Sequence, residues 1–254
     1  MIHILGVGLR GVDSVTLGEM RILSKCEKIY FETYTSVSPG ETANEISSIT
    51  SKHIFPLGRE DVENPSELLR EGADHDICII VTGDPLSATT HNQLRLDAIS
   101  AGVAVNVVEN ASILTSLPGK AGLLPYRMGP PVSLPFLTER FSPRSVLDKL
   151  GRNRDMGFHT IILLDLKDNR TMYPEEAFSY LKQLEEKHGI GVVKNDSLFV
   201  VASKVSQAGE SLSYGTFEKL SKISWKASPS SLIFPADLTE KESEFMGLFC
   251  TKVE

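Results

Sequence analysis

Short apolar runs alternate with helical patterns of apolar residues through the first half of the chain. Runs at 2–5, 28–31, 53–55, 77–81 and 104–108 predict strands, and helical spacing at 17–23, 42–49, from Ser66 onward and at 89–100 predicts helices. Thr16 is placed to cap the first helix. Strands that alternate with helices pair in parallel through crossover connections. The pattern therefore predicts an α/β domain with a ligand crevice at the carboxyl ends of its strands.

The pattern changes after Gly122. Four prolines fall within the twelve residues 124–135, and such a stretch continues neither a helix nor a central strand. We therefore expect an N-terminal α/β domain over 1–122, a proline-rich linker over 123–135 and a C-terminal α/β domain over 136–254. In the latter, helices are predicted at 146–150 and 174–187 and strands at 159–166, 198–203 and 231–234, and Thr239 and Glu242 form a predicted capping box.

The most informative run is 78–91, CIIVTGDPLSATTH, in which an apolar strand ends abruptly and hydroxyl-bearing residues follow. Gly83 allows the backbone to approach a ligand closely, Pro85 ends the strand, and Asp84 carries a free carboxylate at the edge of the sheet. A small polar molecule could dock there. In the alternative interpretation Asp84 only satisfies backbone N–H groups of a strand-to-helix turn.

A second glycine pattern follows the first strand, since Gly6, Gly8 and Gly11 form G-x-G-x-x-G. This is the dinucleotide fingerprint, but no helix begins at once and the nearest acidic residue, Glu32, is not convincingly placed to close the unit. The glycines also permit the close approach of a different adenosyl ligand, so this pattern alone does not choose between them.

Composition and charge narrow the classes of partner. The chain has 254 residues, 41% of them hydrophobic, and a formal net charge of −7, which argues against a general binder of nucleic acid. Three scattered cysteines, without C-x-x-C spacing, indicate neither a disulfide framework nor a cysteine zinc site and fit a reducing cytosol. No signal peptide and no apolar stretch long enough to span a membrane is visible, so we expect a cytoplasmic protein.

Six segments in this order and spacing make the chain similar to a known family. They are ILGVGL at 4–9, FETYTS at 31–36, REDV at 59–62, GDPLSATTH at 83–91, NASI at 110–113 and HTIILLD at 159–165. On these segments the chain resembles the diphthine synthases, within the tetrapyrrole methylase class of S-adenosylmethionine-dependent methyltransferases, over nearly its whole length. One departure is Ser230, where members of the family carry a histidine.

The resemblance implies two α/β domains of the tetrapyrrole methylase type, with the cofactor cleft between them, usually in a homodimer. It implies transfer of methyl groups from S-adenosyl-L-methionine, giving S-adenosyl-L-homocysteine, to the amino group of a 3-amino-3-carboxypropyl chain on a histidine of translation elongation factor 2. By position, the implied cofactor contacts are Leu9, Asp84, Ser87, Ser112, Ile113, Leu164, Val205 and Ser230. Apolar residues fit such a set if their backbone groups contact the adenosyl moiety.

Methyl transfer from a sulfonium needs a neutral amine held in line, so orientation and exclusion of water can supply most of the acceleration. We therefore assign no catalytic residue and no metal. Glu32, Tyr34 and Asp165 lie where they could accept the proton of the amine, although each has a structural alternative. His91 is interpreted as a packing or capping residue. A tetrapyrrole methyltransferase and a non-catalytic adenosyl-binding module stay open as alternatives.

Overall fold

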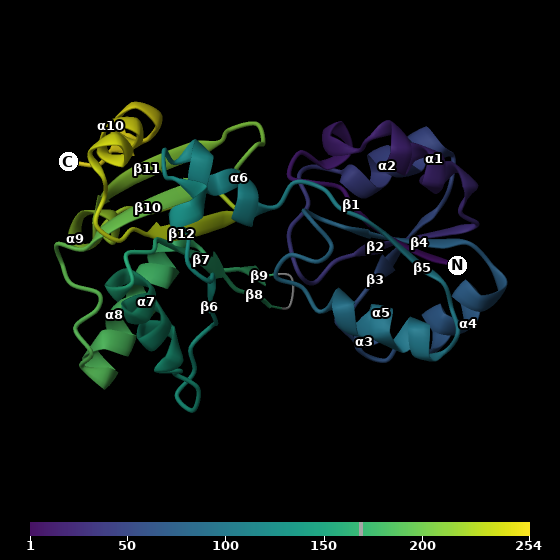
Figure 1. Cartoon of the computed structure of the whole chain (residues 1–254), viewed down its shortest axis with the longest axis horizontal. Helices are drawn as coiled ribbons and strands as arrows, with labels where there is room; N and C mark the ends of the chain where they lie inside the picture. Colours follow the sequence, from purple (N-terminus) through teal and green to yellow (C-terminus); the bar gives the residue numbers. More distant parts are fainter. Residues whose placement is uncertain (168–169) are drawn as a thin grey trace. The chain divides into compact units, whose positions relative to one another are not determined.

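The computed structural model describes residues 1–167 and 170–254 and divides into two compact units, Met1–Ile113 and Leu114–Glu254 (Figure 1). The proline-rich segment 123–135 lies within the second unit, where it contains a short 3₁₀ helix, Pro125–Arg127, and strand β6, Val132–Leu134. Each unit has its own sheet.

The first unit is built on a five-stranded sheet in the order β3-β2-β4-β1-β5, and every pairing in it is parallel. Its strands are β1 (Ile2–Gly6), β2 (Lys28–Glu32), β3 (Ile54–Leu57), β4 (Ile77–Val81) and β5 (Val105–Val108). The predicted parallel α/β arrangement is confirmed. All five residues of the central strand β4 are buried, as expected for a strand with helices on both faces.

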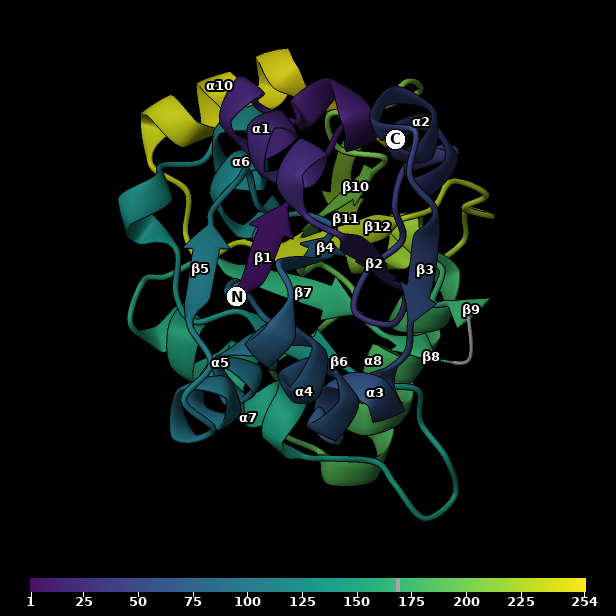
Figure 2. The same ribbon diagram turned by 90° about the vertical axis from the view of Figure 1, so that its right-hand side faces the viewer.

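Helices cover both faces of this sheet (Figure 2). They are α1 (Leu17–Lys25) and α2 (Thr42–Thr50) on one face, and α3 (Arg59–Glu63), α4 (Ser66–Asp74) and α5 (His91–Ser100) on the other. Thr16 caps α1 in a capping box with Glu19, as the sequence predicts. Helix α5 begins at His91, two residues later than predicted, because residues 85–90 form a turn in which the Thr89 hydroxyl donates to the Pro85 carbonyl at 2.6 Å.

The second unit contains a six-stranded mixed sheet in the order β13-β11-β10-β12-β7-β6. Besides β6, its strands are β7 (Thr160–Leu164), β10 (Leu198–Ser203), β11 (Ser211–Thr216), β12 (Ser230–Phe234) and β13 (Thr251–Lys252). Strands β7, β12, β10 and β11 pair antiparallel. The strand predicted over 159–166 is interrupted at Asp165, and a short hairpin of β8 (Leu166–Lys167) and β9 (Arg170–Thr171) follows.

One face of this mixed sheet carries the largest apolar core among the described residues, formed with α7 (Ser145–Asp155), α8 (Pro174–His188) and α9 (Phe217–Leu220). Phe178, Phe199 and Phe217 pack there with ring centroids 5.5 to 6.0 Å apart. Figure 1 shows α10 (Glu240–Phe249) on the opposite side of the sheet from α7 and α8. The predicted capping box of Thr239 and Glu242 opens α10.

Candidate functional site

Three loops of the first unit meet at the carboxyl ends of β1, β4 and β5. The loops after β1 and β4 are joined by a reciprocal pair of backbone hydrogen bonds, Gly8 N to Gly83 O at 3.0 Å and Gly83 N to Gly8 O at 2.8 Å. The amide Nδ2 of Asn110, which follows β5, donates to the carbonyl of Gly6 at 3.0 Å. The structure therefore brings together the glycine pattern and the Gly-Asp-Pro motif that the sequence singled out.

Asp84 is half-buried and its carboxylate is partly occupied by the protein itself. Oδ1 accepts from the backbone N–H of Leu86 at 3.0 Å and from the Ser87 hydroxyl at 2.8 Å, and Oδ2 accepts from the backbone N–H of Asn110 at 3.3 Å. Asp84 therefore stabilises the strand-to-helix turn, which is the alternative interpretation of the sequence. A carboxylate offers about four acceptor positions, and three are used by the described residues. Asp84 keeps capacity for one further donor.

The glycines of these loops differ in how much space they leave. A Cβ on Gly6 would lie 2.5 Å from the Gly83 carbonyl oxygen, so this position is tightly packed. A Cβ on Gly83 would meet nothing closer than the Ala111 carbonyl oxygen at 3.9 Å, and its φ is +79°. Gly83 is therefore less tightly packed than Gly6, although it is buried and its N–H and C=O are both paired with Gly8.

The other sequence-predicted residues of this unit lie in the same three loops. Leu9 follows Gly8, Ser87 follows the Asp84 turn, and Ser112 and Ile113 follow Asn110. Ser112 is buried, whereas Leu9 and Ile113 are half-buried. The fold thus gathers the loops that carry all five predicted positions of the first unit.

The three predicted positions of the second unit lie at strand ends. Leu164 is the last residue of β7, and Val205 is a buried residue of the turn after β10, between two residues with positive φ. Ser230 opens β12, where its hydroxyl lies 2.7 Å from that of Ser203 and donates to the Ala227 carbonyl at 2.8 Å. The described contacts of the Ser230 side chain therefore lie within its own unit.

The candidate proton acceptors are engaged in local structure. Glu32 is 1% exposed, and its carboxylate accepts from the backbone N–H groups of Tyr34 and Thr35 and from the Thr35 hydroxyl. Asp165 accepts from the Phe136 N–H at 3.1 Å. Burial raises the pKa of the Tyr34 phenol, so the phenol stays protonated and its phenolate, the form that can accept a proton, is scarcer at neutral pH. Hydrogen bonds from the protein occupy the carboxylates of Glu32 and Asp165, and the raised pKa keeps the Tyr34 phenol protonated. Each of the three therefore has a physical reason not to act as a base.

His91 is fully buried at the start of α5. Its Nδ1 lies 3.1 Å from the Pro85 carbonyl oxygen, which can only accept, so Nδ1 carries the hydrogen. Burial lowers the pKa of His91, against a weaker opposing effect of Glu32. Within the described residues Nε2 has no hydrogen-bond partner. These contacts support the packing role that the sequence suggested.

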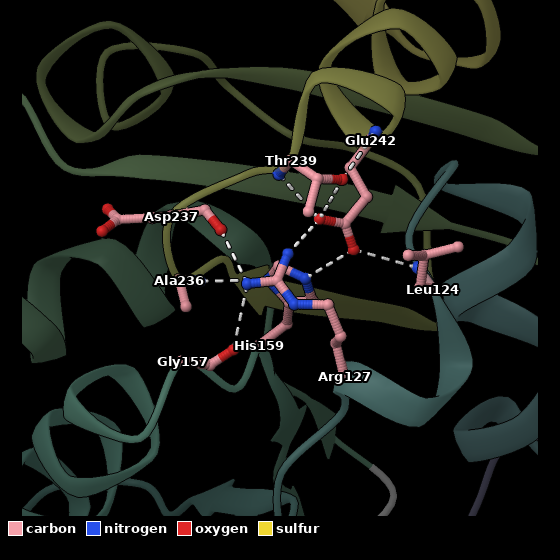
Figure 3. A network of polar contacts seen from close by, with 8 residues as sticks. All are labelled: Leu124, Arg127, Gly157, His159, Ala236, Asp237, Thr239 and Glu242. Carbon is pink, nitrogen blue, oxygen red and sulfur yellow. Dashed lines mark hydrogen bonds and ion pairs between the residues drawn. The ribbon is translucent and has the colours of Figure 1, made fainter.

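The most strongly shifted carboxyl group lies elsewhere, in the second unit (Figure 3). Glu242 and His159 are fully buried, and His159 Nε2 donates to Glu242 Oε1 at 2.9 Å while His159 Nδ1 accepts from the Ala236 N–H at 3.1 Å. Arg127 binds Glu242 and donates to the carbonyls of Gly157 and Asp237.

Burial alone would raise the pKa of Glu242, but hydrogen bonds from the Thr239 N–H, His159 and the Leu124 N–H outweigh it and hold this pKa at about 2. Strongly shifted groups often mark functional sites. Here, however, both nitrogens of His159 and both oxygens of Glu242 are paired within the unit, and both residues are fully buried. The network is therefore structural, and it joins the segment after α6 (Ile113–Lys120) to α10.

The chain is similar to proteins of one family. A family model described as Tetrapyrrole (Corrin/Porphyrin) Methylases matches residues 1–220. The diphthine synthase of Thermoplasma acidophilum is 38% identical over 254 residues, which cover 100% of this chain and 97% of that protein. The diphthine methyl ester synthase of Saccharomyces cerevisiae is 31% identical over 273 residues, covering 100% of this chain and 91% of that protein.

Solved structures agree on the fold. The crystal structure of a diphthine synthase matches with a TM-score of 0.89 and 24% sequence identity, and the match covers 99% of this chain and 97% of that one. None of the helices in residues 1–167 and 170–254 is long and apolar enough to cross a membrane.

Proposed function

This chain belongs to the tetrapyrrole (corrin/porphyrin) methylase family, and from that membership we propose that it methylates the amino group of the 3-amino-3-carboxypropyl-histidine intermediate on translation elongation factor 2, giving diphthine. The methyl donor is S-adenosylmethionine. The single observation that carries the proposal is full-length similarity to diphthine synthases, 38% identity over 100% of the chain in one case. A porphyrin or corrin precursor is the competing substrate, since the family model takes its description from such substrates.

The loops of the first unit fit the donor chemically. S-adenosylmethionine carries a positive sulfonium and an ammonium group, and Asp84, at the carboxyl end of β4, has acceptor capacity for one further donor. We therefore propose that Leu9, Asp84, Ser87, Ser112 and Ile113 contact the cofactor. Leu164, Val205 and Ser230 are the second unit's proposed contacts, by family position alone.

S-adenosylmethionine supplies an activated methyl group that is displaced in line by the acceptor amine. The chain's residues orient and desolvate the reacting groups, which is where most of the acceleration of such a displacement can come from. Asp84 holds the positive donor through its carboxylate.

The acceptor amine must lose a proton before each transfer. Glu32 is committed to its loop, Asp165 to Phe136, and the Tyr34 phenol has a raised pKa. We therefore propose that water, and no dedicated side chain, receives the proton. The rate should then rise with pH until the amine itself is deprotonated.

A second candidate acceptor atom is the carboxylate of the same intermediate, because the yeast relative is a diphthine methyl ester synthase. An ester and an N-methyl group differ chemically, since mild alkali hydrolyses a methyl ester and leaves an N-methyl group intact. Mass spectrometry of the modified peptide before and after alkali therefore distinguishes them. We expect the methyl groups to survive alkali; their loss would assign the carboxylate.

Cofactor binding can be tested separately from transfer. Calorimetry with S-adenosylmethionine and S-adenosylhomocysteine should show one site per chain. Even a millimolar complex, about −4 kcal/mol, would register. No binding of either compound at millimolar concentration would contradict the proposed function.

Assembly and location belong to the same proposal. We propose a homodimer in the cytoplasm, where the three free, buried cysteines Cys26, Cys78 and Cys250 would stay reduced. Light scattering at micromolar concentration should give twice the 27.9 kDa chain mass. A monomer mass would contradict the dimer and leave the proposed chemistry standing.

A further inference from the structure

Asn110 makes more side-chain contacts to the strand-end loops than any role in its own loop requires. Its Nδ2 lies 3.0 Å from the Gly6 carbonyl, 3.0 Å from the Ser14 carbonyl and 3.1 Å from Glu19 Oε1, so its two N–H groups serve three acceptors. Its backbone N–H donates to Asp84 Oδ2 at 3.3 Å. This one residue contacts the loops that follow β1 and β4 from the loop that follows β5.

The third acceptor of the Asn110 amide is the carboxyl group of Glu19. It is 0% exposed, an unusual environment for a carboxyl group, and lies on the first turn of α1. Oε2 accepts from the Thr16 N–H in the capping box, which leaves Oε1 to accept from Asn110. A capping box could form at the surface. The contact with Asn110 gives the second oxygen of this buried carboxyl group a hydrogen-bond donor.

The geometry around Gly8 shows how closely these parts are fitted. A Cβ at Gly8 would lie 2.7 Å from Asn110 Oδ1 and 2.8 Å from Ser14 Cβ, and Asn110 Oδ1 itself accepts from the Ala111 N–H at 2.7 Å. The amide of Asn110 is therefore held on both its nitrogen and its oxygen. Its orientation is fixed by the backbone of two loops.

We propose that Asn110 and Glu19 are positioning residues for the methyl donor, which set the relative placement of the Gly8 loop, the Asp84 carboxylate and the start of the segment that holds Ser112. This inference rests on the proposed function, because it assumes that these loops hold S-adenosylmethionine. Neither residue contacts the ligand in this account. They act through the loops, where small displacements of positioning groups lower affinity and rate.

The test uses the full-length protein and S-adenosylhomocysteine as the calorimetric probe. Asn110→Asp removes the amide donor and brings a second carboxyl group against Glu19, so we expect the dissociation constant to rise about tenfold or more. Glu19→Gln should raise it less. In the double variant the amide introduced at position 19 can donate to the carboxylate introduced at position 110, which restores this one hydrogen bond with reversed polarity. The double variant should therefore bind more tightly than Asn110→Asp alone.

Lys52→Met is the matched control. The Lys52 ammonium donates to the carbonyls of Leu23 at 3.0 Å and Ser24 at 2.6 Å, so it stabilises the other end of α1 without touching the loops. This variant should lower the melting temperature and leave the dissociation constant at the wild-type value. If Asn110→Asp fails to fold, Asn110→Ser removes the same donors without adding charge and takes its place.

Two outcomes overturn the inference. One is a set of Asn110 and Glu19 variants that melt at lower temperature but bind S-adenosylhomocysteine as wild type does, which would make the contacts purely structural. The other is a Lys52→Met protein that loses affinity in proportion to its stability, as the Asn110 variants do. Failure of the wild-type protein to bind would instead contradict the proposed function, so the two failures are distinguishable.

Discussion

Asp84 combines a turn role with spare acceptor capacity, and one substitution separates the two. Asp84→Asn should weaken binding of S-adenosylmethionine by about 1 to 3 kcal/mol, because a charged acceptor for the positive donor is lost. Asn can keep an oxygen toward Leu86 and Ser87 and loses only the longer contact with the Asn110 N–H at 3.3 Å, so the melting temperature should fall only slightly. A lowered melting temperature with unchanged affinity would remove Asp84 from the proposed site. Asp97→Asn, on α5, is the surface control.

Tyr34 tests the proposal that no side chain accepts the amine's proton. Its hydroxyl lies 3.5 Å from the Thr90 hydroxyl, at the limit of a hydrogen bond. Tyr34→Phe should therefore change stability by less than about 0.5 kcal/mol and leave the pH dependence of kcat unaltered. A kcat lowered by about 100-fold or more, as expected on removing a general base, would show that the phenol takes part in the reaction.

At the scale of single residues, the strand-end position of the Gly-Asp-Pro loop could be predicted from the sequence, but the contacts that support this loop could not. The strand-end position of Asp84 follows from an apolar run that stops at Gly-Asp-Pro, which is a local pattern. The contact between Asn110 and Glu19 joins residues 91 positions apart, and Glu19 looks like an ordinary capping glutamate in the sequence. Glu19 becomes buried only when the loops pack together, so no local pattern in the sequence predicts its burial.

At the scale of the elements, glycine at Gly8 in the loop after β1 has two separable reasons: a positive φ, and neighbours that a Cβ would overlap. Gly40, in another loop, shares only the first reason. Gly8 has a φ of +60° and its Cβ would clash with Asn110 and Ser14, whereas Gly40 has a φ of +56° and nothing within 4 Å of such an atom. Gly40→Ala should cost about 1 kcal/mol of unfolding free energy, from backbone strain alone. Gly8→Ala should cost about 1 to 3 kcal/mol more, from overpacking. Equal costs in denaturant titrations would show that the loop relaxes freely.

Helix α10 is anchored by the buried carboxylate of Glu242, which holds Arg127 and His159 (Figure 3). Glu242→Gln puts an amide donor among groups that all donate, so it should destabilise the protein by about 3 kcal/mol. Glu244→Gln, on the exposed side of the same helix, is the control and should cost less than about 0.5 kcal/mol. A neutral result for Glu242→Gln in urea unfolding would contradict this account of the network.

The elements of the first unit follow from the sequence more closely than those of the second. Buried parallel strands are continuous apolar runs, and β4 is an example. Strand β11 has the sequence SLSYGT and is not predicted by its pattern, because it pairs with β10 and β13 while carrying polar residues. Helix α6, with Pro118 inside it, is also not predicted, since proline normally interrupts a helix.

For the whole molecule, the buried ionisable groups predict loss of stability in acid. The pKa of Glu242 is about 2 in the folded chain and about 4.3 when unfolded, so its contribution is complete above the higher value and is lost as the pH falls toward the lower one. Burial also lowers the pKa of His159 below 6.5. As the pH drops below 6.5, the unfolded chain binds a proton at His159 before the folded chain does, so the free energy of unfolding starts to decrease there.

Thermal unfolding from neutral to acid pH checks this prediction. The wild-type melting temperature should fall as the pH drops below 6.5, because of His159, and fall further between about pH 4.3 and about pH 2, because of Glu242. Glu242→Gln should melt lower at neutral pH and should lose less with acid, so that the two curves converge. Parallel curves would show that Glu242 is not responsible for the acid sensitivity.

The central claim is that this chain methylates a protein substrate, and methyl transfer tests it most directly. The protein is incubated with methyl-labelled S-adenosylmethionine and either elongation factor 2 carrying the unmethylated 3-amino-3-carboxypropyl-histidine or a corrin precursor. We expect label on the elongation factor, on the amine of the modified histidine and stable to mild alkali, and none on the corrin. Label on the corrin alone, or on neither while the cofactor binds, would contradict the account.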